Sequence, residues 1–165
     1  MESGHRRSDH RGYGLTETSP VVCINPLDIE DYTGMIGVPI PSTDVTIRDD
    51  NGNNLPIGQI GEICVSGRQV MKGYWNTPDE TANVVRADGW LFTCDVGYMR
   101  EDGFVKCVDR KKDVIVVSGF KLHPNQVEEA AVTHPGVLEA GVKGVADARS
   151  EEAVNLFGQA RSSSH

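Results

Sequence analysis

The run Asp109-Arg110-Lys111-Lys112-Asp113 places five consecutive charged residues between two apolar segments. The segment before it, residues 104–108, and the β-branched segment after it, residues 114–117, each predict a strand. Charged side chains at this density are rarely buried. We therefore expect an exposed joint between two strands, which is either a solvated turn or the rim of a functional site.

The rest of the pattern predicts a β-rich α+β fold. Asp/Asn-Gly turns at residues 50–53 and 101–103 separate short apolar runs, which favours an antiparallel sheet or a small barrel. One helix is expected from Pro78 to about Val85, with Thr77 as N-cap and Glu80 completing a capping box. A second is expected from Pro124 to near His134, ahead of a last strand at residues 137–145. Further strands are expected at residues 21–24, 44–48 and 60–65.

Composition limits the classes of partner that the chain could bind. The formal net charge of −8 argues against a nucleic-acid binder that works by neutralising phosphates, and favours small-molecule partners. The four cysteines have no CxxC spacing and are interpreted as reduced thiols of a cytoplasmic protein. No apolar run approaches the roughly 20 residues of a transmembrane helix, and no secretory signal is recognisable.

Four blocks carry a family resemblance. They are GYGLTET at residues 12–18, GEICVSGRQVMKGYW at 61–75, DGWLFTCD at 88–95, and DRKKDVIVVSGFKLHPNQVEE at 109–129. In this order they resemble the adenylate-forming (AMP-binding) superfamily, and most of all bacterial long-chain fatty acid–CoA ligases. Because neither end follows the family, we interpret the chain as an internal fragment.

The resemblance implies a division of the chain. Residues 12–108 would be the C-terminal portion of the large AMP-binding domain, and residues 109–157 the hinge and part of the small C-terminal domain. Residues 1–11 form a polar head that we expect to be disordered, and residues 158–165 a small polar tail outside the family pattern. Cutting a domain in this way should expose apolar faces and strand edges.

The first block implies part of a nucleotide site. In enzymes that look like this, Tyr13 and Gly14 line the adenine site, Thr16 meets the α-phosphate of ATP and Glu17 holds Mg²⁺. A tyrosine ring can stack on a base, and a carboxylate oxygen suits Mg²⁺. Taken alone, these residues favour a Gly-rich turn capped by Thr; with the other blocks present, the nucleotide site is the better interpretation.

The later blocks imply the remaining contacts. By resemblance, Asp95 and Arg110 bind the ribose, and Lys112 is the hinge residue for the change between two catalytic postures. Gly119 and Lys121 would lie near coenzyme A. The structural alternatives are a turn-closing Asp95, a basic surface turn, a bulge at Gly119 and a surface Lys121.

Cys94 departs from the family, which nearly always has glycine there. A side chain at this position would crowd the ribose or impose an unfavourable φ angle. Trp90 and Thr93 are in register with the family pattern around it.

The implied reaction has two halves. A fatty acid carboxylate attacks the α-phosphate of ATP to give acyl-adenylate, and the thiol of coenzyme A then displaces AMP. The family's phosphate-binding loop with its lysine, and the distal lysine that promotes adenylation, match nothing in these residues. We therefore expect the chain to be inactive alone, although peripheral membrane contact would be compatible with an intact enzyme.

Two other functions stay open. The chain is alternatively a non-catalytic remnant or binding module with at most weak nucleotide affinity. It is alternatively a relative that acts on amino acids or aromatic acids, because the acyl pocket lies outside the matched blocks.

Overall fold

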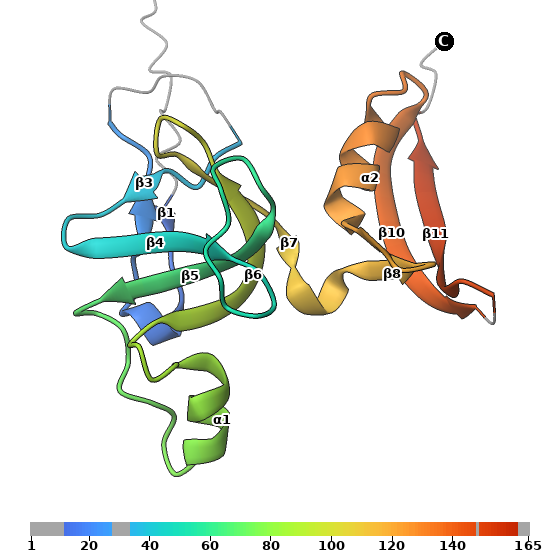
Figure 1. The fold of residues 1–165 in the computed structure, drawn as a ribbon. Helices are drawn as coiled ribbons and strands as arrows, with labels where there is room; N and C mark the ends of the chain where they lie inside the picture. Colours follow the sequence, from blue (N-terminus) through green and yellow to red (C-terminus); the bar gives the residue numbers. More distant parts are fainter. Residues whose placement is uncertain (1–11, 28–33, 148, 162–165) are drawn as a thin grey trace, which may run out of the picture. The chain divides into compact units, whose positions relative to one another are not determined.

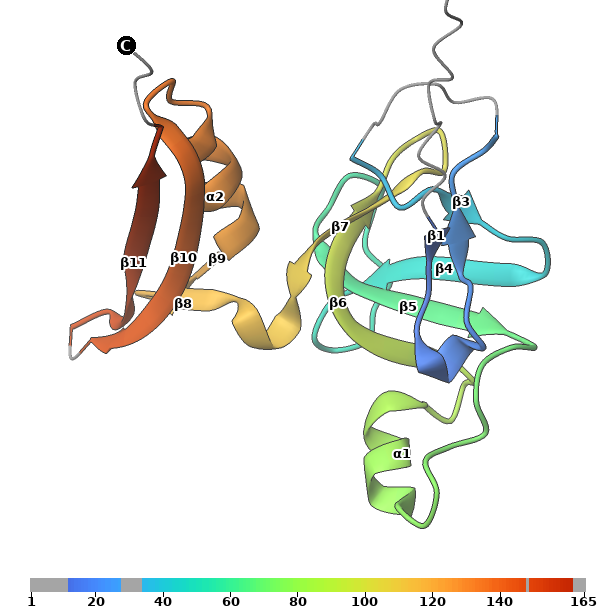
Figure 2. The same cartoon turned by 180° about the vertical axis from the view of Figure 1, so that it is seen from behind.

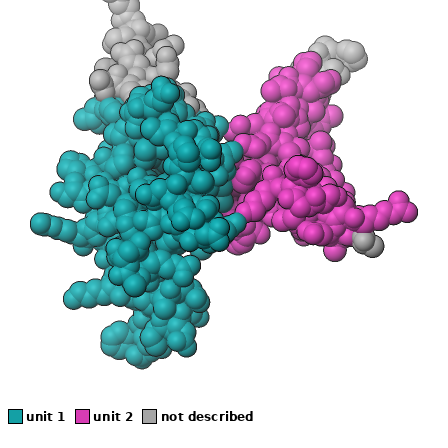
Figure 3. All heavy atoms as spheres, in the orientation of Figure 1, with its two compact units in different colours: residues 1–107 teal, residues 108–165 magenta. Residues whose placement is uncertain are grey.

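The computed structural model describes residues 12–27, 34–147 and 149–161. The chain forms two compact units, residues 1–107 and residues 108–165 (Figure 3). The expected disorder of residues 1–11 and the last four residues of the expected tail lie outside the described residues.

The first unit contains two antiparallel sheets (Figure 1). The smaller has the order β1-β2-β3, and the larger has the order β4-β5-β6-β7, whose last strand reaches into the second unit. Both sheets are open, so within the described residues the strands form sheets and not the alternative small barrel. Their bounds are Gly12–Tyr13 (β1), Cys23–Ile24 (β2), Val38–Pro39 (β3), Thr43–Arg48 (β4), Gly61–Gly67 (β5), Leu91–Met99 (β6) and Val105–Arg110 (β7).

A hydrophobic core joins these sheets. Buried residues alternate with less buried ones over residues 43–47 of β4, because successive side chains of a strand point to opposite faces, whereas residues 62–65 of β5 are all buried. Cys23 of β2 and the preceding Val22 pack in one cluster with residues of β4, β5 and β7. Burial raises the pKa of the Cys23 thiol to about 12. This cluster holds β1 against the larger sheet and so positions Tyr13, which packs at its margin.

The helix α1, Pro78–Val84, begins at the predicted proline. The predicted capping box is wrong, because the Thr77 side chain makes no capping hydrogen bond. Thr81 instead connects the helix to the preceding chain: its hydroxyl donates to the Thr77 carbonyl (3.0 Å) and accepts from the Tyr74 N–H (2.8 Å). The entry to α1 is thereby tied to Tyr74.

The second unit is a four-stranded sheet with one helix. The sheet order is β10-β11-β8-β9, and α2 packs along β10, as both ribbon views show (Figure 2). Two strands of this sheet, β11 and the short β9, were not expected from the sequence. The bounds are Ile115–Val117 (β8), Phe120–Leu122 (β9), Pro124–Val132 (α2), Val137–Asp147 (β10) and Glu151–Ala160 (β11).

The five-residue charged run is not uniformly exposed. Arg110 to Asp113 are exposed and include a short 3-10 helix, η2 (Lys111–Asp113), but Asp109 is buried. Its Oδ2 accepts the Asn125 N–H at 3.1 Å and its Oδ1 accepts the Arg110 N–H at 2.9 Å. Asp109 thus satisfies a first-turn donor of α2, a role that His123, at the N-cap position, does not perform with its side chain.

The observed architecture is the β-rich α+β fold that the sequence predicted, with the larger share in antiparallel sheets. In the part of the chain that the structure describes, neither helix is long and apolar enough to cross a membrane.

Candidate nucleotide site

A hydrogen bond joins the first and third sequence blocks. The Tyr13 hydroxyl donates to Oδ2 of Asp95 at 2.7 Å, although 82 residues separate the two. Asp95 is 5% exposed, and Tyr13 is half-buried. Burial, followed by this bond, raises the pKa of Tyr13 above its ordinary value, so the phenol is a neutral donor. The pair therefore brings together two residues that the resemblance assigns to the nucleotide.

A β-bulge in β6 presents Asp95. Between the paired residues Cys64↔Phe92 and Glu62↔Val96, three residues of β6 face one residue of β5, Ile63. The Thr93 hydroxyl donates to the Ile63 carbonyl (2.8 Å) and accepts the Asp95 N–H (3.1 Å). Bulges of this kind redirect a side chain beside a functional site.

Cys94 occupies the middle of the bulge with φ 61°, in the left-handed region that favours glycine. Its N–H donates to Oε1 of Glu62 at 2.9 Å, and the residue is exposed. The predicted unfavourable φ angle is confirmed. The predicted crowding of a ribose stays a prediction.

The turn after Tyr13 packs against the chain's own backbone. It leads into a 3-10 helix, η1, Thr16–Thr18, and buried Thr18 closes the turn by accepting the Leu15 N–H (2.9 Å) and donating to the Leu15 carbonyl (3.0 Å). A Cβ at Gly14 would overlap the Pro20 carbonyl. In this structure Gly14 therefore allows a close approach of the chain to itself.

Glu17 lies against the second block. The Met71 N–H donates to the Glu17 carbonyl at 2.8 Å, and the Tyr74 hydroxyl donates to Oε1 of Glu17 at 2.8 Å. This bond raises the pKa of Tyr74 to about 12. Tyr74 also lines an open cavity of about 550 Å³ beside α1, together with Lys72, Gly73, Asn76, Thr77, Pro78, Thr81, Ala82 and Val85.

Sequence reasoning missed Tyr74 as part of the site. The residue lies inside the quoted GEICVSGRQVMKGYW block, but nothing in the block shows that its hydroxyl reaches Glu17. Thr16 itself is exposed on η1, beside Glu17. Tyr13, Gly14, Thr16, Glu17 and Asp95 therefore all belong to the first unit.

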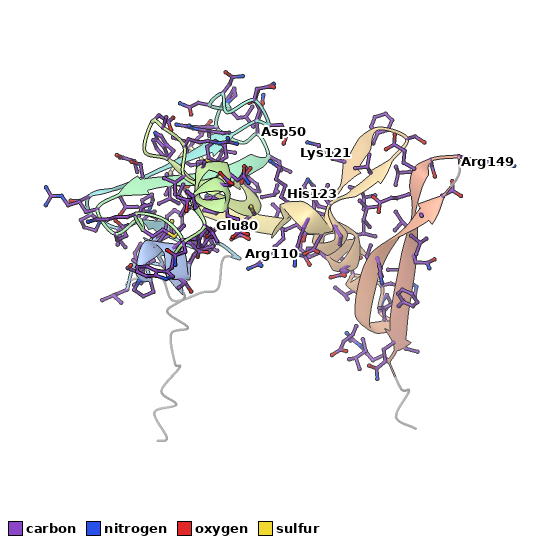
Figure 4. The ribbon with its side chains drawn as sticks, turned by 90° about the horizontal axis from the view of Figure 1, so that it is seen from below. Asp50, Glu80, Arg110, Lys121, His123 and Arg149 are labelled. Atoms are coloured by element: carbon purple, nitrogen blue, oxygen red, sulfur yellow. The ribbon has the colours of Figure 1, made fainter. Side chains whose placement is uncertain are left out.

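Arg110 and Lys112 belong to the second unit. Both are exposed: Arg110 lies at the end of β7 (Figure 4), and Lys112 lies on η2. Lys112 lines a cavity of about 390 Å³ whose wall also includes Asp109, Asp113, Val114, Ile115, Pro124, Asn125, Glu128, Val142, Lys143, Gly144 and Glu152.

Gly119 and Lys121 lie on the β8–β9 hairpin. Ser118 (φ 50°) and Gly119 (φ 81°) both have positive φ and form its two-residue turn, which explains the glycine structurally. Lys121 is exposed on β9, opposite Val116. His123, which follows β9 (Figure 4), is buried, and its Nδ1 has no hydrogen-bond partner among the described residues.

The structure thus places five of the expected residues in the first unit, where Tyr13 contacts Asp95, and four in the second. Within the described residues, no group of three or more His, Cys, Asp or Glu side chains is arranged so that it could hold a metal ion.

Comparison with known proteins gives this arrangement a class. The family model described as "AMP-binding enzyme" matches residues 5–75. Together with the fold, this places the chain in the AMP-binding, adenylate-forming enzyme family.

Relatives within the family are more specific. Over 146 residues, 88% of this chain, it is 55% identical to the long-chain-fatty-acid–CoA ligase of Yersinia pestis. It is 51% identical to that of Escherichia coli over the same share. The chain spans 26% of the length of each of these relatives.

A solved structure with the same fold is MatB from Rhodopseudomonas palustris with ATP bound. It is 36% identical with a TM-score of 0.85, and the match covers 90% of this chain and 30% of that protein.

Proposed function

We propose that the chain is part of an AMP-forming long-chain fatty acid–CoA ligase and retains nucleotide-binding side chains without turning over by itself. The observation that carries this proposal is the Tyr13–Asp95 hydrogen bond, which unites two blocks of the resembled nucleotide site in a buried setting. Supporting it is the 55% identity to a ligase of this kind over 88% of the chain. The proposed division is residues 12–108 from the large domain and 109–157 from the hinge and small domain.

Each first-unit residue has a chemical task in this proposal. Tyr13 and Gly14 flank the adenine, and Asp95 accepts hydrogen bonds from the ribose hydroxyls, for which a carboxylate is well suited. Thr16 donates its hydroxyl to the α-phosphate. The Asp95 side chain is held in place by a β-bulge and by Tyr13, so it is oriented before a nucleotide arrives.

Glu17 is the residue that we propose to hold Mg²⁺. One carboxylate is sufficient, because Mg²⁺ is commonly bound through one or two carboxylates together with substrate phosphates. The Tyr74 hydroxyl fixes one oxygen of Glu17. When bound, the ion would neutralise phosphate charge.

The second-unit residues complete the proposal. Arg110 would contact the ribose, Lys112 would be the hinge residue, and Gly119 and Lys121 would lie near coenzyme A. ATP, coenzyme A and a fatty acid are thus the proposed partners, in the cytoplasm, with the four cysteines free.

Calorimetric titration with AMP, and with ATP plus Mg²⁺, tests the proposal. We expect measurable binding to the wild type and at least about tenfold weaker binding to Asp95→Asn, which is a change of about 1.4 kcal/mol. Asp102→Asn is the matched control, because Asp102 is an exposed partner of Arg100 and should leave binding unchanged. Absence of any binding would contradict the proposal and favour a non-catalytic remnant.

Turnover is tested separately, by pyrophosphate release and thioester formation with ATP, a long-chain fatty acid and coenzyme A. We expect neither product. Thioester formation would show that the chain does not need the phosphate loop and distal lysine of the family. Activity with an amino acid or aromatic acid instead would favour the third interpretation.

A further inference from the structure

The strand β11 has one edge that its own unit barely covers. It pairs with β10 from Glu151 to Ala160, whereas its pairing with β8 among the described residues is confined to Glu151↔Val117. The Val116 N–H of β8 donates to a side-chain atom of β11, Oε2 of Glu152, at 2.7 Å. Beyond that point no described strand pairs with the second edge of β11, which leaves a template for another strand.

The hydrogen bonds fix which backbone groups face this edge. The Ser150 carbonyl accepts the Ser118 N–H (2.8 Å) on the β8 side, and the Arg161 N–H donates to the Gly136 carbonyl (2.9 Å) on the β10 side. Backbone groups alternate in direction along an antiparallel strand. Even-numbered residues from Val154 to Ala160 therefore direct their N–H and carbonyl groups away from β10.

The opposite edge of the hairpin is protected in a way that β11 is not. Val142 of β10 is paired with Leu156 and directs its backbone outward, but its N–H donates to Oε1 of Glu128 on α2 at 2.7 Å. The helix α2 packs along β10. A partner strand would therefore have to displace Glu128 and α2 at the edge of β10, whereas at the edge of β11 it would meet little of this kind.

The sequence of the open edge suits a strand partner. From Ala153 to Ala160 it contains no charged residue and no proline, the residues that commonly protect an exposed edge. Leu156 is 54% exposed and Phe157 is 60% exposed. Since neighbouring side chains point to opposite faces, both faces of the strand carry an exposed apolar side chain.

The charges at the two ends of the strand identify the partner. Glu151 and Glu152 precede the neutral segment, and Arg161 follows it. An antiparallel second copy places the arginine of each chain beside the glutamates of the other, whereas a parallel copy places like charges together. Such a self-complementary patch is what a two-fold interface requires.

We propose that β11 pairs with β11 of a second copy of this chain, antiparallel and about a two-fold axis, over residues 154–160. Among the registers that match outward-facing residues and leave Glu151 with Val117, the one that pairs all of residues 154–160 sets Phe157 opposite Phe157 of the second copy. This is a pair without mutual backbone hydrogen bonds, in which the side chains lie closest. The two sheets become one continuous sheet. The inference does not depend on the proposed ligase function.

Charge substitutions at the two-fold axis test the proposal by sedimentation velocity over a range of concentrations. We expect the wild type to form a dimer and no larger species. Phe157→Lys and Phe157→Glu, each alone, should raise the dimer dissociation constant by about tenfold or more, because like charges then face one another. Mixing the two variants should restore a dimer.

Phe120→Lys is the matched control, because Phe120 is 78% exposed but lies on β9, outside the segment 154–160 that is proposed to pair. It should leave the dissociation constant unchanged. Equal weakening by Phe120→Lys, or no recovery on mixing, would show non-specific apolar association and overturn the proposal. A wild type that is monomeric throughout would overturn it directly.

Amide hydrogen exchange provides a test that needs no variant. On raising the protein concentration, the outward N–H groups of Leu156 and Gly158 should gain protection. The inward N–H of Phe157, which faces β10, should be protected at every concentration. Equal, concentration-independent protection of outward and inward groups would contradict the pairing.

Discussion

The Tyr13 hydroxyl donates a 2.7 Å hydrogen bond to the buried carboxylate of Asp95, and this bond ties β1 to the bulge of β6. A buried carboxylate that loses a donor is poorly compensated by water. The pair therefore has a structural role that is measurable without any nucleotide.

Tyr13→Phe should lower the free energy of unfolding of the first unit by about 1–3 kcal/mol. Tyr74→Phe is the control, because it removes a tyrosine–carboxylate bond at an exposed site and should cost within about 0.5 kcal/mol. Urea unfolding followed by tryptophan fluorescence measures both, since Trp75 and Trp90 are in this unit. Equal losses in the two variants would mean that burial of Asp95 does not set the cost.

Cys94→Gly should stabilise the first unit by up to about 1 kcal/mol. The φ of 61° strains a residue with a Cβ, and glycine removes that strain at some cost in the entropy of the unfolded chain. Cys94→Ala keeps the Cβ and should give no such gain, so the comparison separates backbone strain from loss of the thiol. Stabilisation by alanine equal to that by glycine would argue against strain. The same urea experiment reports the result.

Gly14→Ala should destabilise the first unit by at least about 2 kcal/mol, because the added methyl overlaps the Pro20 carbonyl. Gly12→Ala is the matched control two residues earlier. Its Cβ would lie 3.6 Å from the Cys23 carbonyl oxygen, an ordinary contact, and we expect a change within about 0.5 kcal/mol. If both variants unfold at the wild-type urea concentration, the close approach at Gly14 is not needed for stability.

The second unit should lose stability as the pH falls below the ordinary histidine value. Burial lowers the pKa of His123; Asp109 opposes this shift and Lys121 adds to it. Between the lowered folded pKa and the ordinary value of 6.5, the unfolded chain binds more protons than the folded one. Stability is therefore fully present above 6.5 and declines through that window on acidification.

His123→Gln removes the titrating ring and should flatten this dependence. Urea titrations read from the amide NMR signals of α2 measure the effect, and the ring signals of His123 give its pKa directly. An unchanged pH dependence in the variant would assign the effect to another group.

Local patterns were sufficient for much of the fold. The strand β4 follows from alternation, and β5 from a short run rich in apolar residues. The starts of α1 and α2 follow from proline at the first helical position, and the Asp/Asn-Gly turns from glycine's tolerance of positive φ. All of these effects act within a few residues. The positive φ at Cys94 was also predicted, from the glycine that the resembled family has there. The blocks identified the family.

Tertiary structure decided which polar groups find partners. The sequence alone showed Asp109 as one of five exposed charges, yet it is buried because two backbone N–H groups, one of them from α2, satisfy its carboxylate. It gave no sign that Tyr74 would reach Glu17, or that β11 would pair with β10 along its whole length. Local residue patterns determined most of the elements, and the resemblance of the four blocks indicated the family. Only the tertiary structure determined buried hydrogen bonds such as that between Tyr13 and Asp95, because no local sequence pattern links a donor and an acceptor 82 residues apart.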